Sequence, residues 1–200
     1  MIIGILPQIS IFERCRVEAP WLAFAIAELG QKEGRGLERN NPRILEYIST
    51  FPYLKEIFYQ VKDPKTKKLV SSDFKMGAVD ETPWCACFVA WCLRRAGHPT
   101  SGMNAGARTW RNFGLPMPIT TPRLGAIAVV KKHPSAATAA TTTSGYHVSF
   151  YLHGPAHSPT LLGGNQGNEV CAKQFVGWTI VGYRWPSTFR PVESLGANVA

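Results

Sequence analysis

The 200-residue sequence has no apolar run approaching the roughly 20 residues that a membrane-spanning helix needs. Its apolar N-terminus stops at Pro7 without a basic segment, so we expect no Sec-type signal peptide, synthesis in the cytoplasm and no membrane insertion. Acidic residues are few: 13 Asp and Glu stand against 22 Lys and Arg, a net charge of +9. Such a surface favours polyanions. The sequence contains no zinc-finger spacing and no helix-turn-helix signature, so we do not expect nucleic acid as a partner.

Paired metal-binding motifs are also missing. The sequence has five cysteines, an odd number, and no CxxC or CxxH pair that would suggest zinc. Three cysteines fall in one predicted helix, which is a poor framework for disulfides. We therefore predict reduced thiols and no metal, with Cys87 and Cys92 as small core residues.

The remaining composition, 45% apolar and 18% charged, is typical of a single globular domain. Apolar residues at helical spacing come first, at 20–29, from 41, after 52, from 83 and at 105–113. Segments rich in β-formers follow at 125–130, 146–152, 160–162, 170–176 and 179–185. This order predicts an α+β fold, with N-terminal helices packed on an antiparallel sheet of about five strands.

The domain is expected to span residues 20–186. An irregular segment would precede it over 1–19, and a partly ordered tail would follow over 187–200. The lysine-rich residues 62–68 predict an exposed turn or hairpin. Residues 133–145 are rich in Ala, Thr and Ser, and we expect a mobile loop that acts as a lid or contacts a partner.

The most specific local signal is Pro83-Trp84-Cys85, which places a cysteine at the start of a short predicted helix. Pro83 suits the first helical position, because its φ is already helical and its missing N–H has no partner there. Gly97 suits the helix stop. The helix dipole and the free N–H groups at the helix start favour a thiolate, so Cys85 is a candidate nucleophile.

A nucleophilic cysteine needs a base and a group that orients the base. His147 stands at the head of an alternating strand, a rigid element that can hold a base, whereas His98 follows the helix stop and is expected to be exposed. A strand histidine is more often structural, so geometry must decide. Asn165 lies one strand later and can accept a hydrogen bond from the imidazole, although a left-handed turn is the plainer interpretation.

Cys85, His147 and Asn165, in this order, resemble the papain-like cell-wall hydrolases known as CHAP and NlpC-type cysteine peptidases. The chain is most similar to a bacterial and phage subgroup over roughly residues 20–186. The matching positions are 21–22, 28–30, 33, 36, 41–47, 80–92, 145–148, 162–166 and 182–186. Asp80-Glu-Thr-Pro-Trp-Cys85 is the specific part. Two positions depart from the family pattern: residues 125–128 lack its usual acid, and Ser149 replaces a glycine.

The resemblance implies a papain-like fold, no cofactor, and cleavage of an amide bond in peptidoglycan by an amidase or endopeptidase. Cys85 would attack the carbonyl and His147 would form an ion pair with the thiolate, then protonate the leaving amine. Asn165 would orient the imidazole ring. The backbone N–H of Cys85 would donate to the oxyanion.

Four further residues are candidates for substrate binding. A carboxylate near a helix start also stabilises the helix dipole, and a tryptophan is as often a core residue, so both plainer roles stay open. The candidates are Asp80, Glu81, Trp84 and Gln166.

A monomer without a signal peptide that degrades cell walls fits an antibacterial effector of the type VI secretion kind. Such a protein would act in the periplasm of a target bacterium, with a secretion carrier and a cognate immunity protein as partners. Three alternatives stay open: a phage endolysin with the same chemistry, a papain-fold acyltransferase or deamidase acting on a protein, and a non-enzymatic basic binding module. In the last, Cys85 is merely buried and its thiol pKa lies near or above the ordinary value.

Overall fold

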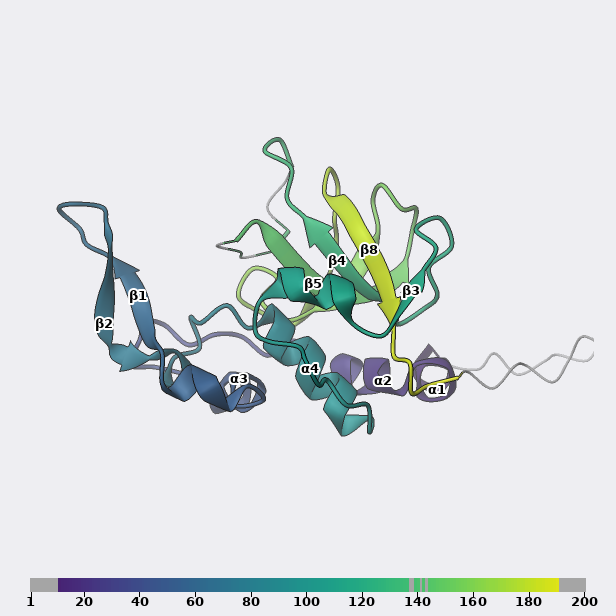
Figure 1. The fold of residues 1–200 in the computed structure, drawn as a ribbon, viewed down its shortest axis with the longest axis horizontal. Coiled ribbons are helices and arrows are strands. Elements are labelled where there is room, and N and C mark those ends of the chain that lie inside the picture. The colour runs from purple at the N-terminus through teal and green to yellow at the C-terminus, as the bar shows by residue number, and fades with distance from the viewer. Residues whose placement is uncertain (1–10, 137–138, 141, 143, 191–200) are drawn as a thin grey trace, which may run out of the picture.

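A computed structural model describes residues 11–136, 139–140, 142 and 144–190 (Figure 1). The helices are α1 (Ile11–Glu18), α2 (Pro20–Ala27), α3 (Pro42–Ile48) and α4 (Cys85–Arg95), with 3₁₀ segments η1 (Pro52–Lys55), η2 (Met76–Ala78) and η3 (Ala107–Asn112). The strands are β1 (Phe58–Lys62), β2 (Leu69–Lys75), β3 (Leu115–Met117), β4 (Ile127–Lys131), β5 (Tyr146–His153), β6 (Thr160–Gly163), β7 (Cys171–Gln174) and β8 (Thr179–Trp185). None of these helices is long and apolar enough to cross a membrane.

Six strands form one antiparallel sheet in the order β3-β8-β4-β5-β6-β7, and β1 and β2 form a separate hairpin. The predicted α+β class is confirmed, and all five predicted strands of the second half are present. The sixth strand, β3, pairs with β8 and has only three residues, which is too short for a visible alternation.

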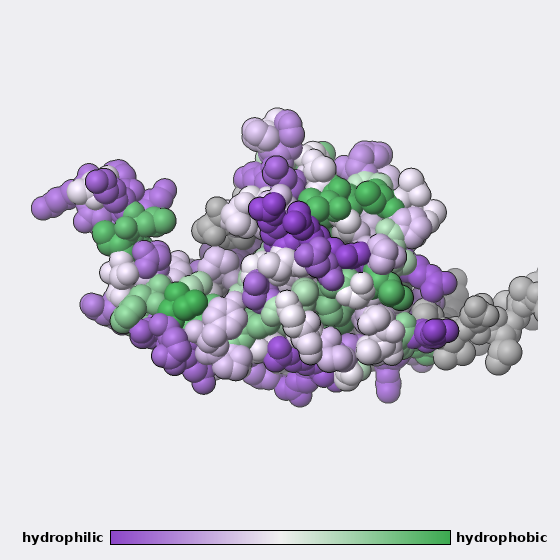
Figure 2. Space-filling model, in the orientation of Figure 1, coloured by the Kyte–Doolittle hydropathy of each residue, from purple (hydrophilic) through white to green (hydrophobic). Residues whose placement is uncertain are grey.

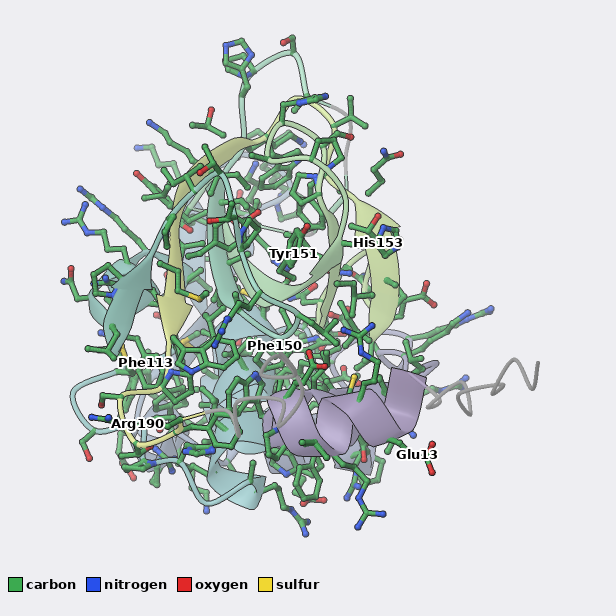
Figure 3. The ribbon with its side chains drawn as sticks, turned by 90° about the vertical axis from the view of Figure 1, so that its right-hand side faces the viewer. Glu13, Phe113, Phe150, Tyr151, His153 and Arg190 are labelled. Atoms are coloured by element: carbon green, nitrogen blue, oxygen red, sulfur yellow. The ribbon has the colours of Figure 1, made fainter. Side chains whose placement is uncertain are left out.

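Helix α4 lies against β5 at the centre of the molecule, with α2 and α3 packed beside it (Figure 1). All nine residues from 85 to 93 are buried, so α4 is enclosed on every side. In β5, consecutive side chains alternate between the two faces of the sheet, as Phe150 and Tyr151 do (Figure 3). Phe150 is fully buried, whereas Tyr151 makes an edge contact with Tyr183.

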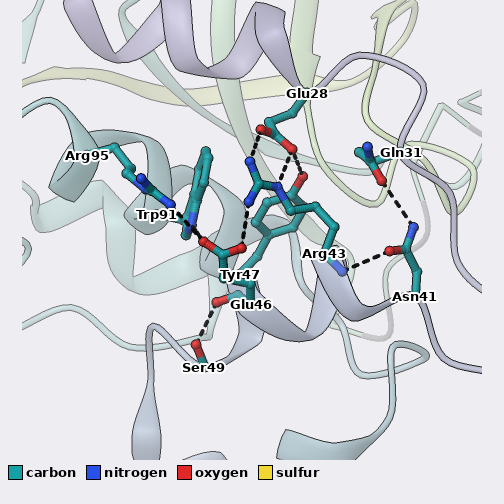
Figure 4. Close-up of polar contacts among 9 residues, drawn as sticks. All are labelled: Glu28, Gln31, Asn41, Arg43, Glu46, Tyr47, Ser49, Trp91 and Arg95. Atoms are coloured by element: carbon teal, nitrogen blue, oxygen red, sulfur yellow. Dashed lines mark hydrogen bonds and ion pairs between the residues drawn. The ribbon is translucent and has the colours of Figure 1, made fainter.

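A polar network ties α2, α3 and α4 together (Figure 4). Arg43 Nε donates to Glu28 Oε2 at 2.7 Å, and the Tyr47 hydroxyl donates to the same oxygen. Burial raises the pKa of Glu28, but hydrogen bonds from Arg43 and Tyr47 outweigh burial and lower it overall. Glu46 accepts from Arg43 and from the Trp91 indole, which anchors α3 on α4.

The helix predicted after Pro52 is wrong beyond its first turn. Leu54, in η1, is buried, but Ile57 and Phe58 are more than 40% exposed and the chain turns into β1. The apolar residues of this stretch are aromatic or β-branched, and pairing with β2 satisfies their backbone groups. The predicted basic hairpin at 62–68 is confirmed: β1 and β2 project from the body, with hydrophilic side chains at the tip (Figures 1 and 2).

Packed residues extend beyond the expected domain span of 20–186 at both ends. Residues 11–18 are helical rather than irregular, and Cys15 in this helix is fully buried. At the other end, Phe189 packs edge-on against the Trp21 ring. The expected irregular residues 1–10 and tail residues 191–200 lie outside the described residues.

Part of the 133–145 segment, expected as a mobile loop, packs against the body of the protein. Ala139 and Ala140 are at most 6% exposed and belong to the hydrophobic core, and Thr142 Oγ1 donates to the Tyr146 carbonyl. Small apolar side chains fit such a packed position as well as they fit a loose loop. Residues 137, 138, 141 and 143 lie outside the described residues.

Candidate active site

Cys85 is the first residue of α4, with Trp84 as the N-cap residue. Pro83 therefore precedes the cap instead of occupying the first helical position, so that part of the prediction is wrong. Gly97 follows the last turn with a φ of 80°, a left-handed conformation that glycine adopts easily, and the predicted stop is confirmed. Cys85 is 4% exposed, and its thiol lies near the backbone N–H of Val148 on β5, the strand that α4 contacts.

The free thiol is neutral at pH 7. Burial raises the pKa of Cys85 to about 11, although the backbone N–H groups of Val148, Ala86 and Cys85 itself act in the opposite direction. The N–H groups at the helix start do favour the thiolate, as expected, but desolvation of the charged form outweighs them in the unliganded protein. Involvement of the Val148 N–H places the thiol beside the residue that follows His147.

His147 is fully buried near the start of β5, on a rigid element as predicted. Its ring stacks on Phe175 with centroids 5.4 Å apart and planes 18° apart. Burial lowers its pKa to about 4, and a hydrogen bond with Gln166 raises it slightly, so the imidazole is neutral at pH 7. Burial of both groups therefore opposes the thiolate–imidazolium ion pair expected from the sequence.

The hydrogen bonds of Gln166 determine which imidazole nitrogen carries the proton. Gln166 Nε2 donates to the carbonyls of Leu161 and Cys171, so its Oε1 must point the other way, towards His147 and Ser149. The Ser149 hydroxyl donates to this Oε1 at 2.8 Å and can then only accept from His147 Nε2, 2.6 Å away. His147 Nε2 also lies 3.2 Å from Gln166 Oε1.

His147 is thus protonated at Nε2 and presents a free lone pair at Nδ1. Nδ1 is buried and has no hydrogen-bond partner in the part of the chain that the structure describes. A neutral imidazole with an unengaged Nδ1, on the strand that packs against the start of α4, can act as a base towards a neighbouring thiol.

No family model, curated protein or solved structure matches this chain. What supports a chemical role for Cys85, His147, Ser149 and Gln166 is therefore the geometry of these residues in this chain.

Asn165 does not hold the imidazole. It is 2% exposed, its Oδ1 has no hydrogen-bond partner among the described residues, and its φ is 58°. This is the left-handed turn that the sequence left open, and Asn tolerates it better than most residues. The next residue, Gln166, carries out the orienting role, and because Gln166 is fully buried it is not a surface contact for substrate.

Ser149 is a site residue that sequence analysis missed. It appeared only as a departure from the glycine usual in similar sequences, although alternation in β5 places residues 147 and 149 on one face. Gly163 leaves room for it: a Cβ at Gly163 would lie 2.4 Å from Ser149 Oγ and 3.1 Å from Gln166 Oε1.

Two candidate substrate-binding residues have structural roles instead. Asp80 is fully buried, and its Oδ2 accepts from the backbone N–H groups of Gly34 and Asn41, each at 2.7 Å. Trp84 is also fully buried, and its indole donates to Glu33 Oε1 at 2.8 Å. Both residues hold the 31–41 loop against the start of α4.

Glu81 is the candidate that stays partly accessible. Burial raises its pKa, and nearby Asp80 adds to the rise. Glu33 completes this acidic group: burial raises its pKa to about 7, with the hydrogen bond from Trp84 acting against the rise and the charges of Asp80 and Glu81 acting with it. These carboxyl groups flank the Cys85 helix but do not line the pocket beside the thiol.

Proposed function

We propose that this protein is a cysteine hydrolase that cleaves an amide bond of bacterial peptidoglycan, on a papain-like arrangement of helix and sheet. The observation that carries the proposal is the held imidazole: Ser149 and Gln166 secure His147 at Nε2 and leave Nδ1 free, on the strand against which Cys85 packs. A merely structural histidine would be expected to use both nitrogens when fully buried.

In the proposed mechanism, His147 Nδ1 takes the proton from the Cys85 thiol as Sγ attacks the substrate carbonyl. Bound substrate brings the two groups into hydrogen-bond contact, because such contacts are often loose in unliganded enzymes. The N–H of Cys85 at the start of α4 stabilises the oxyanion. The imidazolium returns its proton to the leaving amine, and water then hydrolyses the thioester. Throughout, Gln166 Oε1 and Ser149 Oγ accept from Nε2–H and stabilise the positive ring.

Peptidoglycan as substrate is supported by the resemblance of the Asp80–Cys85 motif to cell-wall hydrolases and by the net charge of +9, which suits anionic cell walls. An antibacterial effector that acts in the periplasm of a target cell, with an immunity protein as partner, follows from the same resemblance.

The test is digestion of purified peptidoglycan followed by mass spectrometry of the released fragments. We expect fragments from the wild type and from Cys15→Ala, which removes another buried thiol on α1, but none from Cys85→Ala. Fragments from a folded Cys85→Ala protein would refute the proposal. The masses also identify the cleaved bond and separate an amidase from an endopeptidase.

A second candidate is a non-enzymatic basic module in which Cys85 is a core residue. The burial of Cys85 and its raised pKa favour this candidate. The two are separated by a peptide aldehyde, which forms a thiohemiacetal with a catalytic cysteine. An adduct on Cys85, detected by mass spectrometry and absent in His147→Ala, supports the hydrolase, whereas no adduct and no fragments support the binding module.

A further inference from the structure

A pocket of about 290 Å³ opens beside Cys85, on the side of Pro83. Its walls come from parts of the chain that are distant in sequence: Leu54 on η1 with Ile57 just after it, Met76 on η2, and Ala107 on η3. Tyr53 joins two of these walls, because its hydroxyl accepts from the Ala105 N–H at 3.0 Å.

The described residues that line this pocket include no charged side chain. Most are aliphatic, aromatic or small, and the polar ones are neutral. A charged group that entered the pocket would lose part of its hydration without finding an ionic partner among the described lining residues, which is unfavourable. An uncharged apolar group would instead gain by removing its surface from water.

The size of the pocket limits what it can take. Its volume lies just below the range of about 300–1,000 Å³ that is typical of pockets for small molecules. Leu54 and Ala107 are at most 5% exposed, so these two lining residues are packed in the core and cannot move easily to enlarge the pocket. The pocket therefore suits one side chain or a short stretch of peptide.

We propose that this pocket is the specificity subsite next to the scissile amide, and that it takes an uncharged apolar residue, which in a cell-wall peptide is alanine. The inference rests on the proposed function, since it assumes that Cys85 attacks an amide. Cell-wall peptides contain alanine as well as acidic and diamino residues, so the pocket selects among their bonds. Amides flanked by alanine are cleaved, and amides flanked only by charged residues are poor substrates.

The first experiment compares peptides that differ only in the residue next to the scissile amide: alanine, glutamate or lysine. We expect kcat/KM for the alanine peptide to exceed the other two at least about tenfold. Ile57→Glu places a carboxylate in the pocket and should reduce this preference over the lysine peptide. Val70→Glu is the matched control, because Val70 is 41% exposed against 43% for Ile57 but does not line the pocket.

A binding experiment keeps the inference separate from catalysis. Short acetylated peptide amides of alanine, glutamate and lysine are titrated into the protein while the methyl resonance of Met76 is followed by NMR. A shift caused by the alanine peptide alone supports the subsite, whether or not the protein cleaves anything. Equal shifts, no shift with alanine, or cleavage of peptidoglycan at bonds flanked only by charged residues would overturn it. Failure of the proposed function appears differently, as peptidoglycan that stays intact.

Discussion

Ser149→Ala is the sharpest test of the imidazole-holding arrangement. The substitution removes one hydroxyl that makes two buried hydrogen bonds, 2.6 Å to His147 Nε2 and 2.8 Å to Gln166 Oε1. A buried hydrogen bond contributes about 0.5–1.5 kcal/mol net. His147 Nε2 keeps its 3.2 Å contact with Gln166 Oε1, so no buried donor is left without a partner. We therefore expect a loss of about 1–3 kcal/mol in the free energy of unfolding.

The same substitution should loosen the imidazole. With only the longer contact remaining, we expect kcat/KM on peptidoglycan fragments to fall about tenfold, which corresponds to about 1.4 kcal/mol of lost positioning. Ser158→Ala is the matched control: Ser158 is buried, but its hydroxyl makes no hydrogen bond that is seen among the described residues, and we expect a change within about 0.5 kcal/mol. Urea unfolding and steady-state kinetics measure both quantities.

The decisive readout is the protonation of His147, measured by ¹⁵N NMR of the imidazole. The wild type should carry its proton at Nε2 at pH 7, and Ser149→Ala should show a larger share of the Nδ1–H form. A proton at Nδ1 in the wild type would contradict the tautomer that the hydrogen bonds of Gln166 require, and His147 could then not act as the base through that nitrogen.

Two further predictions concern stability. Gly164→Ala would place a Cβ 2.2 Å from the Trp84 ring, and we expect at least about 1–3 kcal/mol of destabilisation by urea unfolding, whereas Gly182→Ala, with nothing within 4 Å, should be nearly neutral. Burial holds the pKa of His147 near 4, below its ordinary value of 6.5, so its contribution to stability falls as the pH drops from 6.5 to 4. Glu33 has the opposite effect between pH 4.5 and 7, because its pKa is raised from 4.5 to about 7 in the folded state. The unfolded state loses this proton first as pH rises, so the contribution of Glu33 to stability increases as pH falls. Glu33→Gln removes this compensation, so the free energy of unfolding of the variant should fall as pH drops from 6.5, by up to about 1.4 kcal/mol per pH unit. A difference in unfolding free energy between this variant and wild type that does not change with pH would contradict the raised pKa of Glu33.

Local signals in the sequence predicted the elements well. Asn41 caps α3 by accepting from the Arg43 N–H, as Asn before Pro suggests, and the strand predicted at 146–152 is observed as β5, which ends one residue later. The helix at 11–18 and the short strand β3 were missed, and after Pro52 an accidental helical spacing concealed a strand. Strand formation there depends on a partner 7–17 residues away, which a local pattern does not contain.

The burial of His98 and Asp80 could not be predicted from neighbouring residues. A Gly-His-Pro turn suggests exposure, yet His98 is 7% exposed because its ring packs edge-on against Trp21 and its Nδ1 bonds Thr188. Asp80 looked available for substrate, but the folding of the 31–41 loop over it supplies two backbone donors. In both cases burial is decided by a segment far away in the chain.

The sequence by itself determined which residues begin the key elements: Cys85 at the start of a helix and His147 at the head of a strand, since capping, glycine stops and alternation are properties of neighbouring residues. Only the tertiary structure decided that Gln166 rather than Asn165 holds the imidazole, that Ser149 joins it, and that the Cys85 thiol is neutral at rest. The physical reason is that hydrogen-bond geometry and desolvation depend on which distant segments meet and how closely they exclude water.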